Sequence, residues 1–249
     1  MTTENHPPLG SPGWIVPDWP APAHVRAASS LRKGGASRGE FAGLNLGTHV
    51  GDDPERVASN RKLLSQALDL PAEPLWLNQV HGTTAVRADA PATVIADASW
   101  TDRPATVCAV MTADCLPILL CDRRGERIAA VHAGWRGLAD GVVEATVDAL
   151  GTTDLLAWLG PAIGSDAFEV GDEVRRTFID RLGECEHAFR PHADKWKADL
   201  YTLARLVLGG LGIDDIHGGG HCTYGDPDRF YSYRRDGRTG RMATLIWKY

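Results

Sequence analysis

Three side chains that can bind a metal ion stand where short apolar runs of the sequence end. His81 follows one run, Cys115 separates two others, and His132 ends a fourth. Two imidazoles and one thiolate suit zinc, and three protein ligands leave one tetrahedral position open for water or substrate. The long, irregular spacing has no zinc-finger signature. The sequence therefore predicts a catalytic zinc site.

Simpler structural interpretations compete with this one. A cysteine inside an apolar run, such as Cys108, is typical of a small hydrophobic core residue, whereas Cys115 lies between polar and proline residues. His81 precedes a glycine and is also compatible with a simple turn. The segment 217–222, His-Gly-Gly-Gly-His-Cys, resembles a metal motif, but consecutive glycines favour a loop over a helix that would align its histidines.

Composition limits the classes of protein. The chain has 249 residues, 43% hydrophobic and 23% charged, which is enough to bury a core without disulfides or a structural metal. A net charge of −6 argues against a nucleic-acid partner. No apolar run reaches the length of a membrane span. The five cysteines form an odd, sparse set, so we expect the reducing cytoplasm. The oligomeric state stays open.

The elements that must position the three side chains follow from hydrophobic periodicity and turn residues. The patterns predict strands at 75–80, 83–87, 107–111, 118–121, 127–132, 155–159 and 242–247, and helices at 53–68, 138–150, 171–182 and 198–208. Their irregular alternation favours a mixed α/β domain over a regular parallel sheet. Residues 1–24 are proline-rich and predict an extended, flexible tail, and residues 25–249 form the domain.

Several ordered motifs resemble the YfiH family, also called the laccase-domain, polyphenol oxidase-like or Cu-oxidase_4 family, whose members are assigned as purine nucleoside phosphorylases. The matching segments are Arg32–Ser37, Leu44–Asp52, Asn60–Arg61, Asn78–Gly82, Ala96–Ala98, Thr112–Pro117, Val131–Gly137, Gly160–Gly164, Cys222–Thr223, Phe230–Arg235 and Thr239–Arg241. The resemblance covers nearly the whole chain beyond the tail. One departure is Ser30-Leu31, where many members have Thr-Thr.

The resemblance implies that His81, Cys115 and His132 bind the catalytic zinc. It implies a single-domain α/β sandwich of mixed β-sheets flanked by helices, like YfiH and CNF1. It also implies phosphorolysis of adenosine, inosine, guanosine and methylthioadenosine, together with deamination of adenosine. The partners are then a small-molecule nucleoside and phosphate.

Further residues are candidates for substrate binding. An arginine fork matches phosphate, and Arg136, on a glycine-flanked turn, is the first candidate catalytic arginine. Hydrogen-bonding side chains suit a ribose or a purine edge, and carboxylates commonly orient histidine ligands. The remaining candidates are Arg32, Arg61 and Arg234 for phosphate, Asn45, His49 and Gln79 for the nucleoside, and Asp97 and Asp114 as orienting carboxylates.

Three rival functions use the same residues differently. A copper-dependent polyphenol oxidase needs paired histidines, but the chain has nine histidines and no His-X-His pair, so copper suits it less well than zinc. A thiol hydrolase would use Cys115 as nucleophile and His81 or His132 as base, and the resemblance suggests peptidoglycan precursors as its substrates. A non-enzymatic protein with a structural zinc is the third alternative.

Overall fold

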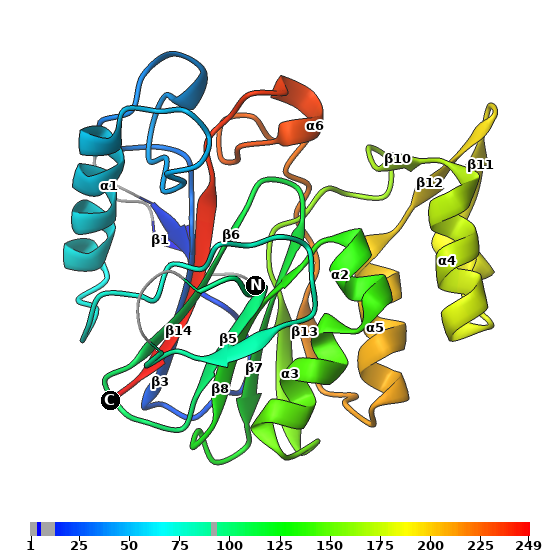
Figure 1. Ribbon diagram of the computed structural model, residues 1–249, viewed down its shortest axis with the longest axis horizontal. Helices are drawn as coiled ribbons and strands as arrows, with labels where there is room; N and C mark the ends of the chain where they lie inside the picture. The colour runs from blue at the N-terminus through cyan, green and yellow to red at the C-terminus, as the bar shows by residue number, and fades with distance from the viewer. Residues whose placement is uncertain (1–3, 6–12, 91–93) are drawn as a thin grey trace.

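The strands form three sheets in the computed structural model, which describes residues 4–5, 13–90 and 94–249 (Figure 1). An antiparallel five-stranded sheet has the order β1 (Glu4–Asn5), β2 (Trp14–Ile15), β3 (Val25–Ser30), β14 (Met242–Lys248) and β6 (Val107–Thr112). A mixed six-stranded sheet has the order β13 (Ile216–Gly218), β9 (Leu155–Leu159), β7 (Leu116–Asp122), β8 (Ile128–Ala133), β5 (Ala98–Thr101) and β4 (Ala85–Arg87). A small antiparallel sheet contains β10 (Glu169–Val170), β12 (Lys195–Ala198) and β11 (Phe189–His192).

The two large sheets pack face to face. Cys108 and Val110 of β6 lie in one buried cluster with Leu119 and Cys121 of β7 and Trp158 of β9. Alternate residues of the same strands point the other way, toward helices. Because both faces of these strands are covered, they read as continuous apolar runs.

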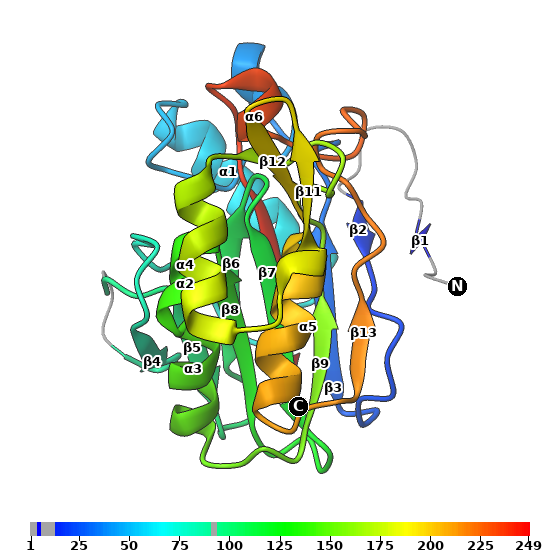
Figure 2. The same ribbon diagram turned by 90° about the vertical axis from the view of Figure 1, so that its right-hand side faces the viewer.

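Helices cover the outer faces of both sheets (Figures 1 and 2). Helix α1 (Pro54–Ala67) packs Leu64 on Val107 and Ala109 of the five-stranded sheet. The outer face of the six-stranded sheet carries α2 (Trp135–Asp140), α3 (Val142–Leu150) and α5 (Leu200–Gly210). Helix α4 (Asp172–Leu182) packs beside the small sheet. The short α6 (Tyr233–Asp236) and the 3-10 turns Gly39–Phe41 and Glu186–Ala188 complete the chain. The predicted sandwich of mixed sheets flanked by helices is confirmed.

Local differences from the predicted elements have physical causes. Asp53 caps α1 as expected, since its side chain accepts a hydrogen bond from the Glu55 N–H. The helix predicted at 138–150 is instead two helices, because Gly141, with φ 105°, interrupts it. The strand predicted at 75–80 is wrong, because this segment makes only one isolated bridge, from Asn78.

The N-terminal segment is described only in part. Residues 1–3 and 6–12 of the predicted tail lie outside the described residues, so the tail there stays a prediction. From Gly13 onward the chain is tied to the sheet, since β2 pairs with β3. None of the helices in the described part of the chain has the length and apolar character needed to cross a membrane.

Candidate metal centre and active site

The three predicted metal ligands meet at one end of the six-stranded sheet. His132 lies on β8 opposite Pro117 of β7, Cys115 lies in the turn between β6 and β7, and His81 lies in the loop before β4. Their ligand atoms are all within 4.8 Å of one another. The rings of His81 and His132 meet edge to face, with centroids 4.8 Å apart. Residues distant in the sequence thus form one cluster.

One ligand–ligand separation has the length expected around a tetrahedral zinc ion. A Zn–S distance of about 2.3 Å and Zn–N distances of about 2.05 Å place sulfur and nitrogen about 3.6 Å apart at a tetrahedral angle. In the structure, Cys115 Sγ and His81 Nε2 are 3.5 Å apart. His132 is buried, Cys115 is half-buried and His81 is exposed, so the cluster is held from inside and open on one side. The group can hold a metal ion.

Asp97 organises two of the three ligands. Its buried carboxylate accepts a hydrogen bond from His132 Nδ1 at 2.8 Å, which directs Nε2 toward the cluster. It also accepts backbone N–H bonds from Val80, His81 and Gly82 at 3.2, 2.9 and 2.7 Å. Although burial raises the pKa of Asp97, these bonds, with that from His132 the strongest, keep it below its ordinary value. Asp97 therefore fixes the His81 loop and the His132 ring together.

Asp114 holds the third ligand through the backbone. It lies in the β6–β7 turn with φ 88°, a conformation that a non-glycine residue adopts only when its surroundings enforce it. Its carboxylate accepts bonds from Thr223 Oγ1 at 2.6 Å, Ser232 Oγ at 3.0 Å and the Arg234 N–H at 2.6 Å. All three of these donors come from the C-terminal segment, and none of them is a histidine. Asp114 joins the turn that carries Cys115 to this segment.

A glycine gives the cluster its room. A Cβ on Gly134 would lie 2.6 Å from His81 Cδ2 and 3.1 Å from Cys115 Sγ. Gly134 follows β8 directly and precedes α2, so the backbone crosses the cluster at close range. Any side chain here would displace a ligand.

The charges in the cluster favour a thiolate. Burial acts to raise the pKa of Cys115, but His132 and His81 outweigh it and lower that pKa to about 6. Burial acts to lower the pKa of His132, but the Cys115 thiolate and the Asp97 carboxylate outweigh it and raise that pKa to about 9. A thiolate is the form that binds metals and the form that attacks electrophiles. By contrast, burial raises the pKa of Cys108 to about 12.

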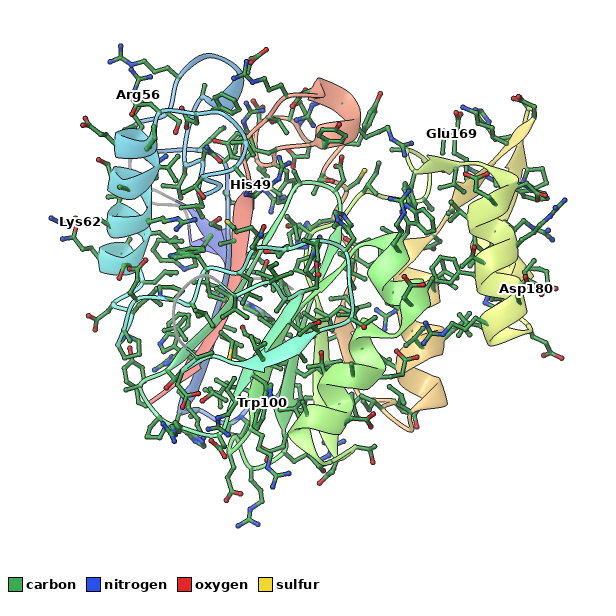
Figure 3. The ribbon with its side chains drawn as sticks, viewed as in Figure 1. His49, Arg56, Lys62, Trp100, Glu169 and Asp180 are labelled. Atoms are coloured by element: carbon green, nitrogen blue, oxygen red, sulfur yellow. The ribbon has the colours of Figure 1, made fainter. Side chains whose placement is uncertain are left out.

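A cavity of about 510 Å³ opens in front of the cluster. Four predicted residues besides the triad line it or its neighbour: His49, Gln79 and Arg136 line this cavity, and Arg61 lines an adjoining one. The amide of Gln79 is already used, since it both donates to and accepts from the Met111 backbone at 2.8 Å. His49, labelled in Figure 3, lies in the segment before α1.

Other predicted residues lie away from this cavity. Asn45 is fully buried and bonds the backbone of Gly47 and Arg241, so it shapes loops. Arg32 donates to the Pro227 carbonyl and stacks on an aromatic ring. Arg234 donates to the Glu169 carbonyl and lines a separate cavity. Asp97 and Asp114 act behind the ligands.

The sequence reasoning missed several lining residues. Met111, Thr112, Ala113, Trp135, Tyr233 and Arg241 also line the cavity. The sequence signal for Tyr233 and Arg241 is weak, because both residues stand out only as members of segments that match the family. Their segment reaches the cavity through β14, which pairs with β6.

Fold and site together define a class: an α/β sandwich with a His–Cys–His cluster at a loop-lined sheet end. Residues 26–249 match the family described as multi-copper polyphenol oxidoreductase laccase. The chain belongs to this family.

Curated relatives carry a different name. A purine nucleoside phosphorylase of Pseudomonas aeruginosa is 56% identical, over 94% of this chain and 98% of its own. The purine nucleoside phosphorylase YfiH of Escherichia coli is 52% identical over the same shares. Among solved structures, a Neisseria meningitidis protein of family DUF152 has a TM-score of 0.90 and 49% identity, over 94% of this chain and 98% of that one. YlmD from Geobacillus stearothermophilus has a TM-score of 0.90 and 31% identity, over 100% and 99%.

Proposed function

We propose that this chain is a zinc-dependent purine nucleoside phosphorylase that also deaminates adenosine, with His81, Cys115 and His132 as the zinc ligands. The observation that carries the proposal is the convergence of these three side chains, with ligand atoms within 4.8 Å of one another, in a chain 56% identical to a purine nucleoside phosphorylase. We further propose adenosine, inosine, guanosine and methylthioadenosine as substrates. The cysteines, all free, support a cytoplasmic location.

The chain's own residues would position the metal ligands and bind the substrate. Asp97 keeps the His132 ring in place, and Asp114 keeps the Cys115 turn in place. The cavity of about 510 Å³ lies within the range of small-molecule sites. A zinc ion bound there would supply Lewis-acid polarisation of a group at its open position. Trp135 and Tyr233 give the cavity aromatic walls suited to a flat purine.

The metal donors favour zinc over a multicopper centre. A multicopper oxidase needs several clusters of histidines to carry electrons, whereas one group of three potential ligands is found among residues 13–90 and 94–249. One imidazole–thiolate set with an open side suits a single borderline-soft ion. Elemental analysis of the purified protein should give about one zinc per chain and little copper.

The decisive assay is phosphate dependence. Inosine with phosphate should give hypoxanthine and ribose 1-phosphate, and omitting phosphate should stop the release of hypoxanthine. Adenosine without phosphate should give inosine and ammonia if the deaminase proposal is correct. Cys115→Ser should lose zinc and both activities together. Cys222→Ser, which alters a half-buried thiol lining another cavity, is the matched control and should keep them. Wild-type protein that carries zinc but releases no purine would refute the phosphorylase proposal.

One observation favours a thiol hydrolase as the second candidate. Cys115 contacts His132, and His132 in turn donates to Asp97. This is the arrangement of nucleophile, base and orienting carboxylate in a Cys–His–Asp triad. Such an enzyme would attack acyl groups, with peptidoglycan precursors as the proposed substrates. A Cys115→Ser protein that keeps bound zinc while losing activity would favour this candidate.

A further inference from the structure

Three cationic or potentially cationic side chains gather on one wall of the metal cavity. Arg241 and His49 line the cavity itself. Arg61 lines a second cavity of about 460 Å³ that shares His49 and Met111 with the first. The two cavities therefore adjoin at His49 and Met111. Arg61 lies on α1, Arg241 directly precedes β14, and His49 lies in the segment before α1.

Both guanidinium groups are held in place by the backbone. Arg61 Nε donates to the Leu46 carbonyl at 3.0 Å, and its guanidinium stacks on Trp76 with 4.1 Å to the ring centroid. Arg241 Nη1 donates to the carbonyls of Thr239 and Gly240, both at 3.0 Å. These contacts fix each guanidinium group. Each group keeps further N–H donors that the backbone carbonyls do not use.

A glycine makes room for Arg241. A Cβ on Gly47 would lie 2.8 Å from Arg241 Cγ. The Gly47 N–H donates to the Asn45 side chain, which also accepts the Arg241 N–H. The loop is thus built around the stem of this arginine, so its direction into the cavity is fixed before any ligand binds.

Neither guanidinium has a carboxylate partner at ion-pair distance among the residues that the structure describes. Other arginines do: Arg87 pairs with Asp102, and Arg123 with Asp215. Glu73 acts on Arg61 only from further away, and its carboxylate accepts the Trp76 indole N–H.

Burial lowers the pKa of both Arg61 and Arg241 and outweighs the opposing charges, which include Glu73 for Arg61 and Cys115 and Asp114 for Arg241. Neither positive charge is therefore fully compensated. Burial and these two arginines likewise lower the pKa of His49. A half-buried charge without a partner is unfavourable, and an anion that enters the cavity offsets this cost.

Other basic side chains near this cavity or on α1 are less suited to hold an anion there. Arg136 lines the cavity, but its guanidinium is exposed and stacks on Trp135. On α1, Arg56 and Lys62 point outward, away from the sheet (Figure 3). An exposed cation keeps its water and gains little from an anion.

We propose that Arg241 and Arg61, which line adjoining cavities that share His49, form the binding subsite for inorganic phosphate. This inference rests on the proposed phosphorylase function and assigns the co-substrate to a wall of the same cavity. The dianion would receive N–H bonds from the guanidinium forks, which match its oxygens and stay charged throughout.

The chemistry balances with no other reactant. An oxygen of hydrogen phosphate forms a bond to ribose C1′ while the bond from C1′ to the purine nitrogen breaks. The electron pair of that bond goes to the purine, which takes up the proton that phosphate gives up. The products are the free purine and ribose 1-phosphate. The arginines neutralise the attacking group and position it.

The test compares four variants of the metal-loaded protein: Arg241→Gln, Arg61→Gln, the rival Arg136→Gln, and the exposed control Arg238→Gln, whose side chain pairs with Glu40. Inorganic phosphate should raise the melting temperature of the wild type, since a ligand that binds the folded state stabilises it. Arg241→Gln should lose this shift and raise the KM for phosphate at least tenfold, with the KM for inosine and the zinc content within twofold. Arg61→Gln should change in the same direction but less, because it lies in the adjoining cavity.

Arg136→Gln and Arg238→Gln should retain the phosphate-induced shift. The proposal is overturned if Arg241→Gln and Arg61→Gln keep the wild-type KM for phosphate, or if Arg136→Gln alone raises it. Should Arg241→Gln fail to fold, Arg241→Lys keeps the charge without the fork. It should raise the KM for phosphate severalfold, and an unchanged KM overturns the proposal.

Two results separate this subsite from the function on which it rests. A phosphate-induced shift that depends on Arg241, in a protein that releases no purine, supports the subsite and removes the phosphorylase proposal. Phosphorolysis with a phosphate KM that is insensitive to Arg241 and Arg61 does the opposite.

Discussion

Replacing Asp97 by asparagine changes one carboxylate that serves four hydrogen-bond donors: His132 Nδ1 and the backbone N–H groups of Val80, His81 and Gly82. Asparagine has one acceptor oxygen and one NH₂ group, so on either side of the amide two donors would face the NH₂. Leaving a donor unsatisfied costs about 1–3 kcal/mol. Since the backbone donors are only part-buried, we take the lower half of that range and expect a total loss of about 2–4 kcal/mol.

The same change weakens the metal site. The loss of a carboxylate behind a histidine ligand reduces metal affinity by roughly 10–100-fold. The expected stability loss of about 2–4 kcal/mol lowers the melting temperature by roughly 5–15 °C for a chain of this length. Zinc affinity would be measured by competition with a chromogenic chelator, and stability by thermal unfolding of the metal-free protein.

A matched control separates the two effects. Asp122 is also buried and also accepts a backbone N–H, from Glu126 at 2.7 Å, but it lies at the other end of β7. Asp122→Asn should leave zinc affinity within twofold. An Asp97→Asn protein with wild-type zinc affinity and a melting temperature within 2 °C of wild type, on the scale set above, would refute the assigned role of Asp97.

Two further predictions concern the cluster itself. Gly134→Ala places a methyl carbon 2.6 Å from His81 Cδ2, so bound zinc measured by mass spectrometry should fall far below one per chain. Gly210→Ala, whose Cβ meets nothing within 4 Å, should keep full zinc, and equal zinc in both variants would contradict the crowding argument. In chelator-treated protein, alkylation of Cys115 by iodoacetamide should rise as pH increases through about 6, where its thiolate forms, and then level off. Cys121, whose pKa burial raises to about 12, should stay unmodified at neutral pH, and peptide mapping that shows equal labelling would overturn this difference.

Much of the fold could be predicted because the strands are buried on both faces. The runs around Cys108 and Leu119 are apolar throughout, and they bound β6 and β7 within one or two residues. Helix α1 was readable from its cap at Asp53 and its proline at the first turn. Segment 75–80 has an apolar pattern too, but there the Gln79 amide replaces a neighbouring strand by bonding Met111 directly. Periodicity cannot detect such a side-chain substitute for pairing.

The site was predictable only where the residue type itself indicates chemistry. His81, Cys115 and His132 could be selected because imidazoles and a thiolate at strand ends are unusual in a core. Arg241 carries no such signal, because an arginine beside glycines is typical of an exposed turn. Its place in the cavity follows from the pairing of β14 with β6, a long-range contact that no local pattern reports.

The turn that carries Cys115 leaves one large sheet at Thr112 and enters the other at Leu116. The imidazole of His132 belongs to the second sheet, and the segment of Arg241 leads into the first. The metal cavity therefore lies at the boundary between the two large sheets, whose facing side chains form one buried layer. A smaller side chain in this buried layer, for instance in Trp158→Phe, would change the distance between Cys115 and Arg241 without altering either residue.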